Sequence, residues 1–461
     1  MKVLAVNAPN VPNTDRDILM PQIDLMQGAG LLERLGHEVA FYDMDAKRHD
    51  EADLQNKLVD YKPDFMYMLF DEVVQIHSHE GLDEAMKMSK AARKTGTKVL
   101  MGGTIPSFFH ERILGRGEAD AVLIGPPGPA LLELFSDSKA GFEGKRRLAR
   151  LQNGKVAGPG IMEKWLTEGF TLDESYGLAA RHLVDESDYP IDVRSIATSR
   201  GCRPRGKGCS FCPYSTFWGA RKEFSTEHVL RDIGQVLERG HGKIILLDST
   251  FTYNPESMKR MAEGIVERGY KVKFGDLSRA DMDLRYLDAL QKAGLSFIHY
   301  GVESGDDATL YELRKGITTD QIRHAFDEAK QRGLRTRASI IIDAGKTRTS
   351  VDRTVDLMLE VKPDEIKAHF LSPRIYSEHG KEITWDRQSI FGDKTTVENP
   401  IKEYARERLD GMCSELGKEG YVQLLDSYAA PGFWKGLWEK GEMGENVRFI
   451  SVAPARYGIC W

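Results

Sequence analysis

The sequence lacks the features of a membrane-spanning or secreted protein. Crossing a bilayer takes about 20 consecutive apolar residues, and apolar runs such as "KIILLDST" from Lys243 to Thr250 are far shorter. The first residues, "MKVLAVNAPN", do not have the layout of a signal peptide and read as a strand. Only five cysteines are present and three of them are clustered, which argues against a disulfide framework and for a reducing compartment. We therefore expect a cytoplasmic protein with no membrane partner.

The sequence also lacks an excess of positive charge. Its formal net charge is -6 and 29% of its residues are charged, so no global basic field would attract nucleic acid, and we expect no nucleic-acid partner. No short repeat or low-complexity tract is visible. With 461 residues, of which 41% are hydrophobic, the chain is too long for one compact core, and two or three domains are expected.

Strand and helix signals alternate over the first 140 residues. The predicted strands are "KVLAVNAP", "HEVAFYDMD", "PDFMYMLF", "TKVLMGG" and "ADAVLIG". Helices between them end at glycines such as Gly36 and Gly96, as helix C-caps require. Continuous apolar strands are typical of a parallel sheet covered on both faces. This pattern predicts a doubly wound, Rossmann-like α/β domain that binds its ligand at the carboxyl ends of the strands.

A second βα series runs over residues 195–371. Its six strands begin with "SIATSRGC" and end with "EIKAHFLSP", and five helices join them. Regular alternation predicts a parallel sheet or barrel, and six units rather than eight favour a partial (β/α)6 barrel. The predicted organisation is a first domain at 1–140, a linker with a helix or two at 141–190, the barrel at 191–385 and a small C-terminal region at 386–461.

The cysteine cluster has the spacing Cys202-x6-Cys209-x2-Cys212 and follows the first strand of the predicted barrel, at the functional end of that fold. Thiolates bind zinc or iron–sulfur clusters. A structural zinc site usually takes four ligands, and the remaining cysteines, Cys413 and Cys460, are distant. Three cysteines on a cubane cluster would leave one iron open for chemistry. The alternatives are a three-cysteine zinc site completed by a histidine, or cysteines of the core.

The stretch "SRGC…CSFCP" resembles the signature of radical S-adenosylmethionine (SAM) enzymes, which is usually Cys-x3-Cys-x2-Cys with an aromatic residue before the last cysteine, here Phe211. The segments "LLDSTFTYN" and "GVES" are similar to later parts of that family. The resemblance implies a [4Fe–4S] cluster on Cys202, Cys209 and Cys212, with SAM on the open iron.

The same resemblance implies roles for residues around SAM. It places Phe211 near the adenine, and Glu303 and Ser304 near the ribose or methionine group. Arg337 would pair with the SAM carboxylate or with Glu303. No catalytic residue is assigned.

Two departures from the family pattern stand out. The cysteine loop has three extra residues and carries Arg203, Arg205 and Lys207, which would favour an anionic ligand near the open iron. Where relatives often have Gly-Pro-Gly-Glu-Thr, this chain has "DAGKTRTS" at residues 343–350. The second departure puts in doubt whether the substrate is held as in those relatives.

The segment beginning "VLMGGTIPSFF" resembles the cobalamin-binding domain fused ahead of many radical SAM cores. That resemblance implies that Gly102 and Gly103 let the corrin's nucleotide tail approach the backbone, and that Gly125 plays a similar part. The Asp-x-His-x-x-Gly motif of classical cobalamin domains is not found, which suggests a cobalt lower face without imidazole; His77 is an alternative ligand. The domain could also be a relic that binds no cobalamin.

Together these resemblances imply a cobalamin-dependent radical SAM enzyme. The expected reaction is methyl transfer from methylcobalamin to an unactivated carbon, or to phosphorus, in a small-molecule or peptide substrate. An electron donor such as flavodoxin or ferredoxin is expected. The alternatives are cyclisation, rearrangement or non-methyl group transfer, with cobalamin as a redox partner or absent, and a non-catalytic sensor. A methylthiotransferase is excluded because it would need a second cysteine set ahead of the core, and residues 1–201 contain no cysteine.

Overall fold

The computed structural model describes most of the chain. The described residues are 1–9, 20–70, 79–136, 141–161, 163–189, 192–202, 208–281, 284–371, 400–416, 421–425 and 447–449. They divide into two compact units. The first unit holds the described residues up to Cys202 together with Tyr214–His241, and the second holds residues 208–213 and those from Gly242 onward.

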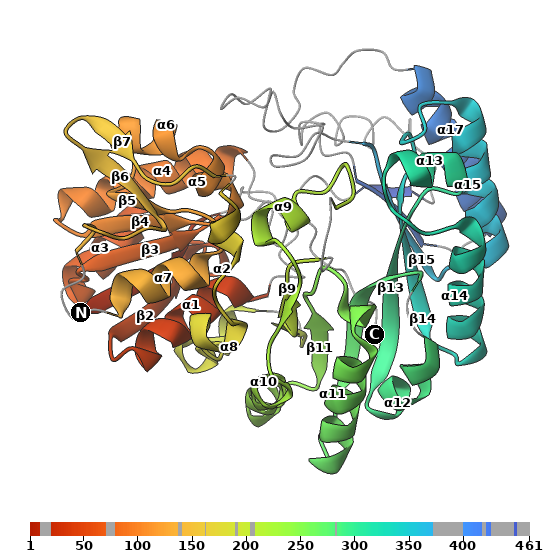
Figure 1. The fold of residues 1–461 in the computed structure, drawn as a ribbon, viewed down its shortest axis with the longest axis horizontal. Helices are drawn as coiled ribbons and strands as arrows, with labels where there is room; N and C mark the ends of the chain where they lie inside the picture. The colour runs from red at the N-terminus through yellow and green to blue at the C-terminus, as the bar shows by residue number, and fades with distance from the viewer. Residues whose placement is uncertain are drawn as a thin grey trace. The chain divides into compact units, whose positions relative to one another are not determined.

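The first unit is built on a sheet with the strand order β2-β1-β3-β4-β5-β6-β7 (Figure 1). Its strands are β1 (Lys2–Asn7), β2 (Glu38–Asp43), β3 (Phe65–Leu69), β4 (Lys98–Gly102), β5 (Ala121–Leu123), β6 (Leu148–Gln152) and β7 (Lys155–Ala157). The first five run parallel and almost all of their side chains are buried, as their continuous apolar sequences predict.

Helices cover both faces of this sheet. Helix α1 (Ile23–Arg34) packs beside α7 (Pro127–Phe135), whereas α3 (Glu51–Tyr61) packs beside α4 (His79–Lys94) on the other side (Figure 1). The doubly wound α/β prediction is therefore confirmed. The helix α3 was missed, although Asp50 and Asp53 form a capping box at its start.

The predicted linker begins with a β-hairpin and not with a helix. Residues 143–147 lead into β6, which pairs antiparallel with β5 and with β7. Asn153 and Gly154 join β6 to β7 with φ angles of 53° and 73°. Both values lie in the left-handed region that a two-residue hairpin turn needs, so this Asn-Gly pair was the signal for the hairpin.

The first unit also contains the start of the predicted barrel. The segment "SIATSRGC", predicted as one strand, forms β8 (Arg194–Ile196) and β9 (Ser199–Arg200). Strand β9 pairs antiparallel with β10 (Lys222–Glu223). Between them lies α9 (Tyr214–Trp218), and α10 (Thr226–Glu238) follows.

In the second unit, seven parallel strands lie in sequence order from β11 to β17 (Figure 1). They are β11 (Lys243–Leu246), β12 (Lys273–Arg279), β13 (Leu295–Glu303), β14 (Arg335–Ile341), β15 (Glu365–His369), β16 (Tyr421–Leu425) and β17 (Val447–Phe449). Helices α11 (Pro255–Glu267), α12 (Leu287–Lys292), α14 (Thr319–Gln331) and α15 (Arg348–Val361) join the first five. The barrel-type α/β prediction is confirmed.

The predicted count of six strands is too low. Strands β16 and β17 come from the segment predicted as a separate C-terminal region, and they extend the sheet beyond β15. Helix α17 (Pro400–Leu416) packs against α15. The limits predicted for the domains stay a prediction. None of the helices within the described ranges is long and apolar enough to cross a membrane.

Candidate functional site

Two of the three clustered cysteines form a tight turn in the second unit. The backbone N–H of Cys212 donates to the carbonyl of Cys209 at 3.1 Å, and the N–H of Ser210 donates to the carbonyl of Leu313 at 3.0 Å. Phe211 packs against a small apolar cluster of Leu313, Ile341 and Ala344. Neither cysteine forms a disulfide within the described part of the chain, and both are partly exposed. The turn is therefore fastened to the residue that follows helix α13 (Asp307–Glu312).

Cys202 belongs to the first unit and lies two residues after the end of β9. Its thiol is also free and partly exposed, so the donor chemistry of the three cysteines fits an iron–sulfur cluster. Arg203, Arg205 and Lys207 lie outside the described residues. Among the residues that the structure describes, no three His, Cys, Asp or Glu side chains form a ready metal-binding group, so the cysteine triad stays a prediction.

Glu303 ends strand β13 in an unusual conformation. Its φ of +67° lies in the left-handed region, and its side chain is buried. The Oε1 atom accepts a hydrogen bond from the Nζ of Lys315 at 2.7 Å. A Cβ on Gly301 would lie 2.7 Å from that Nζ and 2.9 Å from that Oε1, so a larger residue there would displace the ends of both side chains. Backbone strain at a buried charged residue is typical of a functional site.

The "KG" of Lys315 and Gly316, downstream of "GVES", is also similar to the radical SAM family, but no role was predicted for Lys315. Its backbone carbonyl accepts from the guanidinium of Arg279, at the end of β12, at 2.7 Å. Because Leu313 also holds the cysteine turn, the short segment 313–316 contacts that turn and the ends of two strands.

Ser304 is buried and its hydroxyl is used within the protein. Its Oγ lies 3.3 Å from the Oγ1 of Thr354 and accepts from the N–H of Asp306 at 3.2 Å. These bonds fix the turn that leads into α13. A contact of Ser304 or Glu303 with SAM stays a prediction.

Arg337 is paired with Glu365 and not with Glu303. Its Nε donates to the Oε2 of Glu365 at 2.7 Å, and its guanidinium lies 5.2 Å from the centre of the Phe297 ring. Arg337 is opposite Glu365 in the register of β14 and β15, whereas Glu303 pairs with Lys315. The predicted Arg337–Glu303 pair is therefore wrong, and a contact of Arg337 with the SAM carboxylate stays a prediction.

His299 lies on the same strand as Glu303 and is fully buried. Burial and the nearby cations Arg337, Lys367, His369 and Lys315 hold its pKa well below the usual range of histidine. The ring is therefore neutral at physiological pH. Tyr300, the next residue, faces the other way and donates its hydroxyl to Ala325 of α14. In β13, β14 and β15, charged and histidine side chains lie only at every second position, and this alternation in the sequence indicates that one face of the sheet is polar.

The glycines predicted to contact cobalamin have different reasons to be glycine. A Cβ on Gly103, whose φ is +102°, would lie 2.0 Å from the carbonyl oxygen of Phe70. Gly125 has a φ of +78°, and a Cβ there would lie 3.2 Å from the Cβ of Leu166. A Cβ on Gly102 would meet only the side chains of Leu123 and Leu69, at 3.4 Å or more, an ordinary contact. Gly102 is thus the position where the fold itself does not demand a glycine, which fits a close ligand; its contact with cobalamin stays a prediction.

A second feature of this sheet edge was not predicted. Asp43, at the end of β2, is fully buried and accepts from the Nδ2 of Asn7 at 2.9 Å and from the hydroxyl of Tyr189 at 2.7 Å. Burial raises its pKa to about 6. His77 and the loop around it lie outside the described residues.

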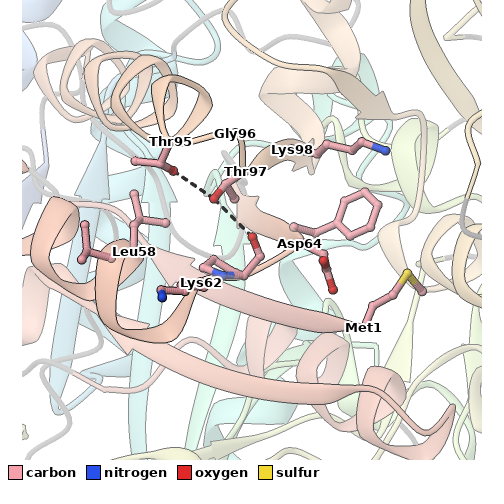
Figure 2. Close-up of a pocket in the computed structure, with 11 residues that line it drawn as sticks. Met1, Leu58, Lys62, Asp64, Thr95, Gly96, Thr97 and Lys98 are labelled. Carbon is pink, nitrogen blue, oxygen red and sulfur yellow. Dashed lines mark hydrogen bonds between the residues drawn. The ribbon is translucent and has the colours of Figure 1, made fainter.

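A hollow of about 620 Å³ lies at the amino ends of the strands in the sheet of the first unit (Figure 2). Met1, Asp64 and Lys98, among the residues that line it, stand at or next to the amino ends of β1, β3 and β4. Open α/β sheets bind their ligands at the carboxyl ends of the strands. We therefore do not assign this hollow to a cofactor.

Comparisons with known families match both parts of the chain. The radical SAM superfamily matches residues 196–358, and the B12 binding domain matches residues 17–135. The chain is a radical SAM protein with an N-terminal B12-binding domain. The predicted family and the predicted cofactor set, a [4Fe–4S] cluster, SAM and cobalamin, are confirmed at the level of these domains.

Individual relatives are distant. Hopanoid C-3 methylase of Methylococcus capsulatus is 25% identical over 362 residues, which is 74% of this chain and 65% of that protein. The chain thus spans just under two thirds of the length of that relative. An anaerobic magnesium-protoporphyrin IX monomethyl ester cyclase of Synechocystis sp. is 22% identical over 86% of this chain and 79% of its own length. The methyltransferase TsrM of Kitasatospora setae has a similar fold, with a TM-score of 0.68, 18% identity and coverage of 83% of this chain and 75% of its own.

Proposed function

We propose that this chain is a cobalamin-dependent radical SAM enzyme that transfers a methyl group to an unactivated carbon, or to phosphorus, of a small-molecule or peptide substrate. The observation that carries the proposal is the place of the cysteine turn. Ser210 bonds to Leu313, and Lys315, two residues further on, holds Glu303 at the end of β13. Two cysteines and a buried acidic residue are therefore fastened to one short segment.

The roles of the residues follow from their chemistry. Cys202, Cys209 and Cys212 would hold three irons of the cluster as thiolates. The Glu303 carboxylate would accept hydrogen bonds from the ribose hydroxyls of SAM, and Lys315 keeps that carboxylate oriented. When bound, the cluster and SAM supply the radical that takes a hydrogen atom from the substrate, and cobalamin supplies the methyl group. A flavodoxin or ferredoxin would supply electrons.

The test is anaerobic reconstitution followed by turnover. We expect protein that carries iron, sulfide and one cobalamin, and that transfers label from methyl-labelled SAM to a substrate while forming 5'-deoxyadenosine. Cys202→Ala, Cys209→Ala and Cys212→Ala should each reduce the bound iron. If all three variants keep a full cluster, or if the wild type binds no cobalamin, the proposal is wrong.

One observation favours a second candidate reaction, a cyclisation or rearrangement. Of the two curated relatives described above, the one that matches more of this chain, over 86% of its length, is a cyclase. In that case 5'-deoxyadenosine would form with substrate while no labelled methyl group reaches the product. The two reactions are thus separated by the fate of the label in the same assay.

A further inference from the structure

Arg200 is a charged side chain buried directly before the cysteine loop. It is in strand β9, two residues before Cys202, and only about 2% of it is exposed. It is among the largest side chains that are fully buried in the described part of the chain. A charge in such a place has to be paired, because burial of an unpaired guanidinium is strongly unfavourable.

The partners of Arg200 come from the B12-binding domain. Its Nε donates to the Oδ1 of Asp24 at 3.1 Å, and one terminal nitrogen donates to the same oxygen and, at 3.0 Å, to the Oε1 of Gln27. Asp24 and Gln27 are both in helix α1, within the range that matches the B12 binding domain. The guanidinium also lies 5.4 Å from the centre of the Trp218 ring, which completes an aromatic cover over the charge.

The charge is permanent. Burial is the largest single influence and by itself would lower the pKa of Arg200, but the charge and hydrogen bond of Asp24, together with Tyr214 and Tyr176, raise that pKa above its ordinary value. Arg200 therefore keeps its positive charge while it is buried against Asp24.

The backbone between Arg200 and Cys202 is clamped. Arg200 is paired with Lys222 in the β9–β10 ladder, and its other terminal nitrogen bonds to the carbonyl of Ser199 at 3.1 Å. Gly201 has a φ of +81°, and a Cβ there would lie 2.5 Å from the carbonyl oxygen of Ala220. A movement of the Arg200 side chain would therefore be passed on to Cys202 through one tightly packed residue.

Helix α1 is a firm base for this contact. A Cβ on Gly30 would lie 1.9 Å from the carbonyl oxygen of Leu178, so helix and linker backbone touch. The N–H of Gly177 bonds to the carbonyl of Gln27, and that of Ala180 to the carbonyl of Met26. The side chains of Asp24 and Gln27 are thus presented from a fixed helix.

We propose that Arg200 is a positioning residue for Cys202, and that helix α1 of the B12-binding domain is, through Asp24 and Gln27, a structural part of the iron–sulfur site. This inference rests on the proposed function in one respect, that Cys202 is a cluster ligand. It predicts that the B12-binding domain is needed for cluster assembly even in the absence of cobalamin.

The experiment compares Asp24→Asn and Arg200→Lys with a matched control, Asp232→Asn. The control breaks the Arg181–Asp232 pair, which is as deeply buried, with side chains 3% and 1% exposed and a 2.9 Å contact. Thermal unfolding first shows whether Asp24→Asn and Asp232→Asn lose comparable stability. The full chain is then reconstituted anaerobically with iron and sulfide, and iron is counted.

A second measurement does not need the cluster. In full-length protein with Cys209, Cys212, Cys413 and Cys460 changed to alanine, the alkylation rate of Cys202 reports its local order. We expect Asp24→Asn and Arg200→Lys to raise the alkylation rate of Cys202 several-fold. In the reconstituted full chain, the same two variants should bind at most half as much iron as the wild type. Asp232→Asn should change neither quantity.

The outcomes are distinguishable. If Asp24→Asn and Asp232→Asn behave alike in both measurements, the inference is wrong. If the wild type takes up no cluster, the proposed function fails while the alkylation arm still decides the inference. Should Asp24→Asn not fold, the double variant Asp24→Asn/Arg200→Met removes both charges, and such replacements are often tolerated. We expect it to fold with a raised alkylation rate, and an unchanged rate overturns the inference.

Discussion

At the scale of single residues, the Glu303–Lys315 pair joins strain, burial and charge. Glu303 holds a left-handed backbone conformation, and its partner Lys315 is about 8% exposed at the side chain. Removing one member of a buried pair leaves the other charge without compensation, at a cost of roughly 3–5 kcal/mol. The pair is therefore both a stability element of the second unit and the determinant of how the Glu303 carboxylate is oriented.

The first prediction concerns Lys315. Lys315→Met should lower the free energy of unfolding by about 3 kcal/mol and weaken SAM binding to the reconstituted protein, because Glu303 loses its partner. Lys315→Arg should recover part of both losses. Urea unfolding and equilibrium SAM binding measure these effects. The control is Arg323→Met, which breaks an exposed pair with Glu360 and should change stability by no more than about 1 kcal/mol; an equal effect of Lys315→Met and Arg323→Met would contradict the prediction.

The second prediction concerns pH and Asp43. Its folded pKa is about 6 because of burial, against about 3.9 in an unfolded chain. Between these values the folded state holds a proton that the unfolded state releases, so the contribution of this group to stability falls as pH rises from about 4 to about 6 and is then constant. Asp43→Asn removes the cost of ionisation, and the Nδ2 of the new amide can donate to the Tyr189 hydroxyl.

We therefore expect Asp43→Asn to be more stable than the wild type at pH 7.5, by up to roughly 3 kcal/mol, with the gain vanishing near pH 4. Unfolding by urea at pH 4.5, 6 and 7.5 measures the difference. Asp276, whose pKa burial raises to about 7, acts in the same direction in both proteins, so the difference between them isolates Asp43. A variant that is less stable than the wild type at pH 7.5 would show that Asp43 is ionised without cost.

At the scale of secondary-structure elements, helix α1 and the linker pack closely because a glycine of α1 lies at their contact. Gly30 lies in the interior of α1, where alanine is intrinsically better by about 1 kcal/mol. A Cβ there would meet the carbonyl oxygen of Leu178 at 1.9 Å, and backbone atoms cannot give way cheaply. Packing therefore outweighs helix propensity at this position.

The third prediction follows from that balance. Gly30→Ala should lower the free energy of unfolding by about 1–3 kcal/mol. The control is Gly115→Ala in helix α6 (His110–Gly115), where an added Cβ meets nothing within 4 Å, so that this change should be neutral or stabilising. Chemical unfolding of both variants decides the matter, and a Gly30→Ala protein as stable as Gly115→Ala would mean that α1 and the linker do not touch.

Some of the secondary-structure elements could be predicted from the sequence and others could not. Strands β1, β3 and β4 are predictable because they are continuous apolar runs that end at turns. The β6–β7 hairpin was missed, although the pair Asn153-Gly154 is a signal for a hairpin turn. Strand β16, "YVQLL", was not recognised although it is as long as β3 and β4, and it pairs with β15 in the sheet.

The contacts of the candidate site were harder to predict because they depend on register and on distant segments. Arg337 pairs with Glu365 because their strands place them opposite each other, and spacing along the chain does not reveal that register. Arg200 and Asp24 are separated by 176 positions. The cysteines and the "GVES" stretch were found because they are local motifs. A role for Lys315 follows only from its contact with Glu303 in the structure.

At the scale of the whole molecule, the chain combines two domains that we predict to hold their cofactors with separate sets of residues. The predicted cluster ligands are three cysteines that follow β9, and the predicted cobalamin contacts are the glycine that ends β4 and glycines after β4 and β5. Gly102 and Gly103 are adjacent yet differ in what an added methyl group would do: at Gly103 it meets the Phe70 carbonyl oxygen at 2.0 Å, and at Gly102 it meets only flexible side chains. The adjacent pair therefore separates damage to the fold from damage to cofactor binding.

The fourth prediction uses this difference. Gly102→Ala should unfold like the wild type but bind less cobalamin, because its Cβ would occupy space next to the ligand and not space needed by the fold. Gly103→Ala should lose stability by at least about 2 kcal/mol, since its φ of +102° and the close carbonyl both exclude alanine.

The Cys202→Ala/Cys209→Ala/Cys212→Ala variant should keep cobalamin and bind no cluster. Corrin absorbance, iron content and urea unfolding of the three proteins give the complete comparison. Equal cobalamin in Gly102→Ala and wild type would remove Gly102 from the binding site, and loss of cobalamin with the cysteines would mean that the two cofactors are held by one site.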